Sequence, residues 1–344
     1  LKFRFFLYCM FINYLITQGG MMSRKLLIFG NGLGMAIDAN HYSLTNPLNT
    51  VWSDDALWNN TVHRDLIQNC IPSGQCPISE EELDKLYLVS TSCDYLNDYP
   101  NTVNGEHWLS SYGQDFTEAT QEYIHTVASH LFDSTNTLPI AFKTALIDFV
   151  RTTKSHVATL NYDKLLYQEF INSGICNGFS GQLVDGFPNS GFSSSNLVRR
   201  FGKDFGYYMH LHGCPLFKDI NGTTYKLSTS QISTTNTFPS KHVVLTHIPH
   251  KPSVITASEV LSTYWSYLIL ALSEVNDIIL FGYSGCDTHL NKILKVHASS
   301  KNKIIVEWNG DGQTDQQRQQ FWDGELGANV ILQRMPDITQ FTAW

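Results

Sequence analysis

The stretch Leu26–Asp38, LLIFGNGLGMAID, decides the fold of this 344-residue chain. A continuous apolar run ends at Gly30 and passes through Asn31, Gly32 and Gly34 into residues with helical spacing. Apolar runs without polar alternation are typical of strands that are buried on both faces of a parallel sheet. Closely spaced glycines allow a sharp turn and a close approach to a ligand. The stretch therefore predicts a buried strand, a tight loop and a helix.

Three more apolar runs resemble the first, Lys25–Phe29, and end in turn residues: His156–Leu160, Asp277–Phe281 and Lys303–Val306. The first three of these four runs lead directly into a polar or glycine-rich cluster and then a helical pattern. Repetition of strand, tight loop and helix predicts an α/β fold with a Rossmann-like, doubly wound parallel sheet. Ligands of such folds bind outside the carboxyl ends of the strands.

Residues 22–344 are predicted to form one domain with two insertions. No parallel strand is evident between about 40 and 154, and three segments there have helical spacing: Ile78–Ser90, Glu118–Phe132 and Pro139–Arg151. Ser79 has the position of an N-cap before acidic residues of a first turn. We therefore expect a mostly helical insertion. A second insertion, about 184–240, is rich in Gly, Ser, Thr and Asn and is expected to be irregular.

The chain is acidic, with a net charge of −8 at pH 7. It has no dense stripe of Lys and Arg, which argues against direct nucleic-acid binding because phosphate neutralisation needs clustered cations. Hydrophobic residues make up 42% of the chain, enough for a substantial core. The seven cysteines include no C-x-x-C pair and are interpreted as reduced thiols of a cytoplasmic protein. Cys70 and Cys76 are the one plausible local pair for a disulfide or metal.

The N-terminus resembles a signal peptide, since Lys2 and Arg4 precede the apolar stretch Phe5–Ile16. Met21 and Met22 follow, directly before the first core strand. We interpret residues 1–21 as an upstream extension of the true start; a secretory signal or a membrane anchor is the alternative. The apolar stretch is short for a membrane span, and no membrane association is expected.

The glycine loop has the spacing G-x-G-x-G. A helix that begins immediately after it would direct free N–H groups and its positive dipole end at a phosphate. The dehydrogenase spacing G-x-G-x-x-G is absent, as is an acidic residue at the end of a second strand about 20 positions later. A tight turn without any ligand is the alternative.

The segment Thr159–Leu166, TLNYDKLL, places Asn161 and Asp163 after a predicted strand. Both residues are candidates for a site at the carboxyl edge of the sheet, and helix capping is the simpler alternative.

The segment Tyr207–Pro215, YYMHLHGCP, contains two histidines that would point to the same face of a strand. His210 and His212 have no accompanying ligand cluster apart from Cys214, so no metal site is predicted. His212 stands where the strand breaks into a loop, a place suited to a general base. A purely structural histidine is the alternative.

The segment Asp277–Leu294, DIILFGYSGCDTHLNKIL, repeats the opening pattern. Gly282 and Ser284 can offer backbone and hydroxyl groups to a nucleotide, and Asp287 can cap a helix or accept a ribose hydroxyl. Glu307 ends a later strand and can hold vicinal hydroxyls, or lie idle on a solvent-facing loop. A Ser-His-Asp hydrolase is disfavoured because GYSGC lacks one residue of the G-x-S-x-G elbow.

In this order, GNGLGMA, TLNYDKLL, HLHG, GYSGCD and IIVEWN resemble the motifs of the sirtuin-like superfamily, and most of all its bacterial branch of NAD-cleaving defence proteins. The resemblance covers about half of the chain. It implies that Asn161 and His212 are catalytic. The NAD-binding residues that it and the motifs indicate are Gly30, Asn31, Gly32, Gly34, Asp163, Gly282, Ser284, Asp287 and Glu307. The family's deacylases bind a structural zinc through two C-x-x-C pairs, which this chain lacks.

The sequence thus predicts an NAD hydrolase that releases nicotinamide and ADP-ribose without a metal, with NAD as its substrate. The resemblance further implies an antiphage effector that depletes NAD. A homo-oligomer is expected, together with a separately encoded sensor or ATPase as a partner. Two alternatives remain: a deacylase or ADP-ribosyltransferase that uses a protein acceptor, and a non-catalytic NAD or ADP-ribose sensor or assembly subunit.

Overall fold

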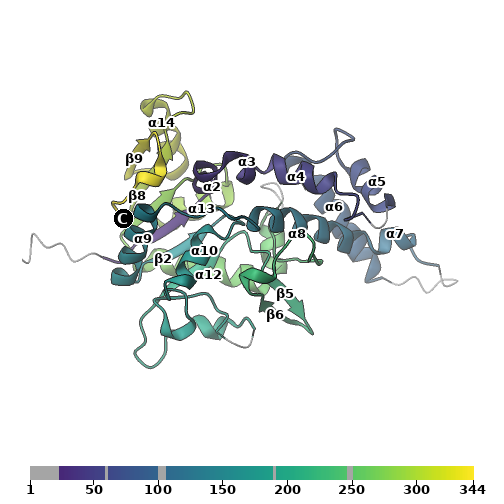
Figure 1. Cartoon of the computed structure of the whole chain (residues 1–344), viewed down its shortest axis with the longest axis horizontal. Coiled ribbons are helices and arrows are strands. Elements are labelled where there is room, and N and C mark those ends of the chain that lie inside the picture. The colour runs from purple at the N-terminus through teal and green to yellow at the C-terminus, as the bar shows by residue number, and fades with distance from the viewer. Residues whose placement is uncertain (1–22, 59–60, 100–105, 189–190, 246–250) are drawn as a thin grey trace, which may run out of the picture.

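The central element of the fold is a parallel sheet. The structure, a computed structural model, describes residues 23–58, 61–99, 106–188, 191–245 and 251–344. In these residues seven parallel strands are ordered β3-β4-β2-β1-β7-β8-β9 (Figure 1). Their bounds are β1 Leu26–Phe29, β2 His156–Thr159, β3 Leu183–Val184, β4 Gly206–His210, β7 Asp277–Phe281, β8 Asn302–Trp308 and β9 Val330–Met335. The predicted α/β fold with a parallel sheet is confirmed.

The four strands predicted from apolar runs form the centre of this sheet. Strand β1 is fully buried and lies between β2 and β7, with Leu26 opposite His156 on one side and Ile278 on the other. Strand β8 extends the sheet beyond β7. A strand that is covered on both faces can be apolar at every position, which explains why these runs were recognisable.

Helices cover both faces of the sheet. The α-helices that alternate with the strands are α2 Gly32–Ile37, α9 Ile140–Thr153, α10 Leu165–Asn172, α11 Lys251–Ala257, α12 Glu259–Glu274, α13 Thr288–His297 and α14 Asp315–Leu326. From β1 the chain moves to β2 and towards β3 at one edge, and later returns to β7, β8 and β9 on the other side of β1. Right-handed crossovers therefore place α9 and α10 on one face and α12, α13 and α14 on the other.

The described part of the long connection between β1 and β2 contains helices and no strand, in agreement with the predicted mostly helical insertion. It contains α3 Ala39–Tyr42, α4 Thr45–Trp52, α5 Thr61–Cys70, α6 Glu80–Asn97, α7 Ser111–Gln114 and α8 Phe116–Phe132, ahead of α9. The predicted N-cap is confirmed, since Ser79 Oγ accepts a hydrogen bond from Glu82 N. Figure 1 shows α4 to α8 gathered to one side of the sheet. Insertion residues such as Leu48 and Tyr123 belong to the same continuous apolar core as the strands.

The second insertion contains an antiparallel hairpin, β5 Phe217–Ile220 and β6 Thr223–Lys226, among short irregular segments. His242 holds this hairpin to the domain: its Nε2 lies 2.9 Å from Asp219 Oδ1, and its Nδ1 lies 2.8 Å from Ser258 Oγ. This Asp-His-Ser arrangement is no hydrolase site, because Ser258 is fully buried and caps α12 through Leu261 N.

The interpretation of residues 1–21 lies outside the described residues. Within the described ranges, no single helix has the length and hydropathy to cross a membrane; α11 and α12 meet that test only as a pair, bent by 111°. The described cysteines are free, including Cys70 and Cys76.

Candidate active site

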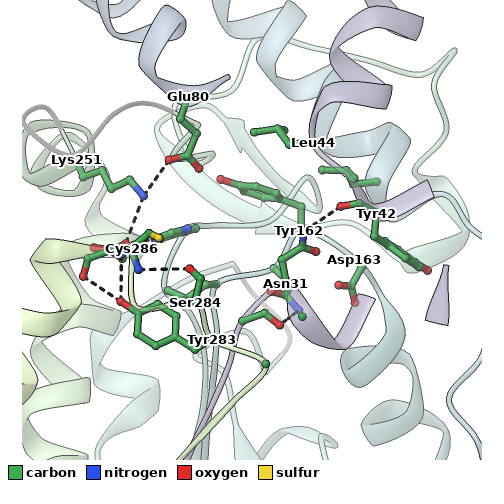
Figure 2. Close-up of a pocket in the computed structure, with 18 residues that line it drawn as sticks. Asn31, Tyr42, Leu44, Glu80, Tyr162, Asp163, Lys251, Tyr283, Ser284 and Cys286 are labelled. Atoms are coloured by element: carbon green, nitrogen blue, oxygen red, sulfur yellow. Dashed lines mark hydrogen bonds and ion pairs between the residues drawn. The ribbon is translucent and has the colours of Figure 1, made fainter. Parts of the chain in front are cut away.

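A pocket opens at the carboxyl ends of the central strands, next to β1, where the strand order reverses. This is the place at which open α/β sheets bind their ligands. Its cavity has a volume of about 320 Å³. Nine of the eleven predicted site residues line it: Gly30, Asn31, Gly32, Asn161, Asp163, His212, Gly282, Ser284 and Asp287. Figure 2 shows Lys251 and Glu80 at one end of this pocket, and Tyr42 and Asp163 at the other.

The glycine loop after β1 packs against the corresponding loop after β7. A Cβ atom on Gly32 would lie 2.6 Å from Gly282 O, so the two loops can be this close only because glycines form the contact. Gly282 has a φ of +59°, which favours glycine as well. Gly30 N donates to Phe281 O at 2.9 Å, and Gly32 N donates to Gly282 O at 2.8 Å. These two N–H groups are therefore already bonded to the β7 loop rather than directed at a phosphate.

Asn161 and Asp163 follow the end of β2, and both line the pocket. Asn161 Nδ2 donates to Gly30 O at 3.1 Å, which ties the two loops together. Asp163 Oδ1 accepts from Leu165 N at 2.9 Å, a backbone bond of the kind that the simpler alternative assumed, although the N-cap position of α10 is Lys164. Asn161 Oδ1 and Asp163 Oδ2 are buried and have no hydrogen-bond partner among the described residues. Burial raises the pKa of Asp163 to about 6.

His212 forms the second chemical feature of the pocket. Strand β4 ends at His210, so His212 stands in the following loop, as predicted. Its Nε2 lies 2.8 Å from Asp287 Oδ2, and both side chains are buried. Burial opposes ionisation of Asp287, but the hydrogen bond from His212 and the charge of Lys251 hold its pKa well below the ordinary value. Asp287 is therefore a carboxylate that only accepts, and His212 Nε2 carries the proton.

This tautomer leaves the other ring nitrogen of His212 with a free lone pair. Within the described part of the chain, no hydrogen bond involves His212 Nδ1. Asp287 also caps α13, because its Oδ1 accepts from His289 N and Leu290 N. The cap that the sequence predicted is thus present, and it fixes the carboxylate that orients His212.

The neighbouring histidine does not share this site. The His210 ring is buried and contacts the rings of Tyr167, Tyr208 and Phe217. Burial lowers the pKa of His210 to about 3, so the side chain is neutral. The two histidines therefore form no pair, and His210 is part of the aromatic core.

Two predicted residues lie outside the pocket lining. Gly34 packs against Tyr42, whose Cγ would lie 2.9 Å from an added Cβ. Glu307 is buried in β8, where Arg318 Nε donates to Oε1 at 2.9 Å and Arg318 Nη2 to Oε2 at 2.7 Å. Arg334 Nε lies 3.1 Å from the same Oε1, and Trp322 Nε1 donates to Oε2. The carboxylate of Glu307 is thus fully engaged in holding β8, β9 and α14 together.

Sequence reasoning missed an ion network, made of buried Lys251 and Asp287 and half-buried Glu80, at the other end of the pocket. Lys251, at the start of α11, places its Nζ 3.3 Å from Asp287 Oδ2 and 3.2 Å from Glu80 Oε2. Glu80 is the first residue of α6 in the helical insertion. Neither residue belongs to a motif, and only the folded chain brings them to the strand ends.

The remaining lining residues are apolar or aromatic. Tyr42, Leu44 and Leu131 come from the helical insertion, and Leu160, Tyr162, Tyr283 and Cys286 come from the strand-end loops. Those in the loops neighbour predicted residues in the quoted motifs and could have been inferred from that proximity. Asn31 links the two groups, because its Nδ2 donates to Tyr42 O at 2.9 Å.

No group of three or more His, Cys, Asp or Glu side chains in the described residues is arranged to hold a metal ion. A scan against models of known protein families gave no match, and neither did a search of curated proteins.

Proposed function

We propose that this protein is an NAD hydrolase that cleaves the bond between nicotinamide and ribose. The observation that carries the proposal is the His212–Asp287 pair, 2.8 Å apart, in a pocket that also contains Asn161. The order of the motifs, which resembles that of the sirtuin-like superfamily, supports the choice of NAD. A general base beside a buried amide and a buried carboxyl is the chemistry that a hydrolytic cleavage needs.

In the proposed reaction, water attacks C1′ of the ribose while its bond to the nicotinamide nitrogen breaks. The bonding electrons leave with nicotinamide, which departs as a neutral molecule because its ring nitrogen is cationic in NAD. His212 Nδ1 accepts the proton of the attacking water, and Asp287 stabilises the resulting imidazolium. The products are nicotinamide, ADP-ribose and a proton.

Asn161 and Asp163 suit the positive charge that develops at C1′ and the cationic ring of the substrate. Their buried oxygens without partners are fixed acceptors, and such acceptors stabilise positive charge strongly when water is excluded. Asn161 is held by Gly30 O, so its oxygen has a defined direction. We propose that it positions the attacking water or a ribose hydroxyl.

The size of the pocket is consistent with this assignment. Ligand sites span about 300–1,000 Å³, and the cavity of about 320 Å³ is at the small end of that range. It suits the nicotinamide and its ribose, while the adenosine half would extend outwards past Ser284. The proposal of an antiphage effector with a separate sensor or ATPase is supported by the family resemblance alone. The cytoplasmic location is proposed from the cysteine pattern, and the homo-oligomer from the need to restrain an NADase.

The test is to incubate the purified protein with NAD and to follow nicotinamide release by chromatography. We expect His212→Ala and Asn161→Ala to lower the rate by about 10²–10⁴-fold. His297→Ala is the matched control, because His297 is exposed at the end of α13. Rates within threefold of the wild type in both site variants would refute the assignment. Intact NAD that is nevertheless bound tightly would identify a sensor instead.

A further inference from the structure

The proposed substrate carries a diphosphate, and the pocket offers few groups to bind it. The N–H groups of Gly30 and Gly32 are bonded to backbone oxygens of the β7 loop. At the start of α13, the N–H groups of His289 and Leu290 are bonded to Asp287. Ser284 Oγ accepts from Cys286 N at 3.3 Å. These four N–H groups are thus already satisfied by other parts of the protein.

Lys251 is the one Lys or Arg among the described residues that line the pocket. Three carboxyl groups line it as well, those of Glu80, Asp163 and Asp287. An anionic ligand would be repelled by this set unless a cation faced it. The residue Lys251 is 4% exposed, and its ammonium stands on a flexible four-carbon stem, so it can change partners by rotation of the side chain.

We propose that Lys251 binds the diphosphate of the substrate and that Glu80 competes with the substrate for it. This inference rests on the proposed function, since the diphosphate belongs to NAD. Lys251 Nζ lies 3.2 Å from Glu80 Oε2 and 3.3 Å from Asp287 Oδ2, so two carboxylates already share its three N–H donors and compete with a phosphate for them (Figure 2).

Two consequences follow from the contacts that Lys251 makes with Asp287 and Glu80. Asp287 Oδ2 receives both Lys251 Nζ and His212 Nε2. When Lys251 moves to the diphosphate, that oxygen interacts with His212 alone, so the hydrogen bond that orients His212 is no longer shared. In addition, Glu80 begins α6, so a movement of the helical insertion changes how readily Lys251 is released.

Calorimetry with two reaction products tests the inference. ADP-ribose contains the diphosphate and nicotinamide does not. We expect Lys251→Met to weaken ADP-ribose binding at least tenfold and to leave nicotinamide binding within twofold of the wild type. Lys292→Met is the matched control, because Lys292 is exposed on α13. Increasing salt should weaken the wild type more than Lys251→Met, since one charge contact is missing in the variant.

Glu80→Gln is expected to increase the affinity for ADP-ribose, a change that misfolding of the variant would not cause. Removing the competing carboxylate should tighten ADP-ribose binding by about threefold or more. The inference is overturned if Lys251→Met binds ADP-ribose within twofold of the wild type, if it loses both ligands equally, or if Glu80→Gln weakens binding. NAD cleavage by the wild type is measured separately. If the wild type cleaves NAD and Lys251→Met keeps the affinity for ADP-ribose, only the inference about Lys251 is refuted. If Lys251→Met binds ADP-ribose more weakly but the wild type does not cleave NAD, only the proposed hydrolase activity is refuted.

Discussion

Replacing Asp163 by asparagine removes a buried charge from the pocket while retaining an acceptor for Leu165 N. The Oδ1 atom of an asparagine can still accept from Leu165 N, and the carboxylate oxygen without a partner becomes part of an uncharged amide. Burial raises the pKa of Asp163 from 3.8 to about 6. The folded protein therefore binds this proton more tightly than the unfolded chain does.

The sign and size of the effect follow from that difference. The wild type loses stability as the pH rises from 3.8 through 6, because the folded state must then bury an ionised carboxylate. At about 1.4 kcal/mol for each unit of pKa, the whole loss is about 3 kcal/mol, and about half of it falls between pH 5 and pH 7.5. Asp163→Asn has no such group, so its stability relative to the wild type should rise by about 1.5 kcal/mol over that interval.

Urea denaturation at pH 5 and pH 7.5 measures this quantity for the wild type and Asp163→Asn. Asp94→Asn is the matched control, since Asp94 is exposed on α6 and the net charge changes equally. The comparison between the two pH values cancels any packing cost that the amide itself introduces. A relative stability that differs by less than about 0.5 kcal/mol between them would show that Asp163 has no raised pKa.

Two further substitutions test the other buried carboxylates. Asp287→Asn keeps an oxygen for the cap of α13 but removes the anionic partner of His212, so kcat for nicotinamide release should fall by about 10²–10⁴-fold; a kcat within threefold of the wild type would contradict the proposed pair. Glu307→Ala leaves Arg318 and Arg334 without their buried counter-ion and should cost about 3–5 kcal/mol in urea denaturation. The KM of Glu307→Ala for NAD should stay within twofold of the wild type at a temperature where the variant is folded. A tenfold rise in KM would indicate that Glu307 takes part in NAD binding.

The centre of the fold was predictable because strands that are buried on both faces of a sheet have continuous apolar sequences. Strand β1 can be apolar at every position, and the same holds for β2 and β7. The edge strand β9 was not predicted, because its residues are mostly half-buried and mix apolar with polar side chains. Strand β3 has only two residues, Leu183 and Val184, which is too short for any periodicity.

The candidate site was predictable as far as it follows the strand ends. Asn161, Asp163 and His212 each come directly after a strand, and parallel strands bring such positions together. Glu80 and Lys251 were not predictable, because their ion pair joins an insertion helix to a distant segment. The glycine pattern predicts a phosphate loop, and the structure shows that Gly30 and Gly32 also form the contact between two loops. Sequence spacing alone does not distinguish these uses of glycine.

The most direct test of the proposed function is to quantify both products after incubation of the purified wild-type protein with NAD. We expect nicotinamide and free ADP-ribose in equal amounts from the wild type, and neither product from His212→Ala. NAD recovered intact, or nicotinamide released without free ADP-ribose, would contradict hydrolysis at this site.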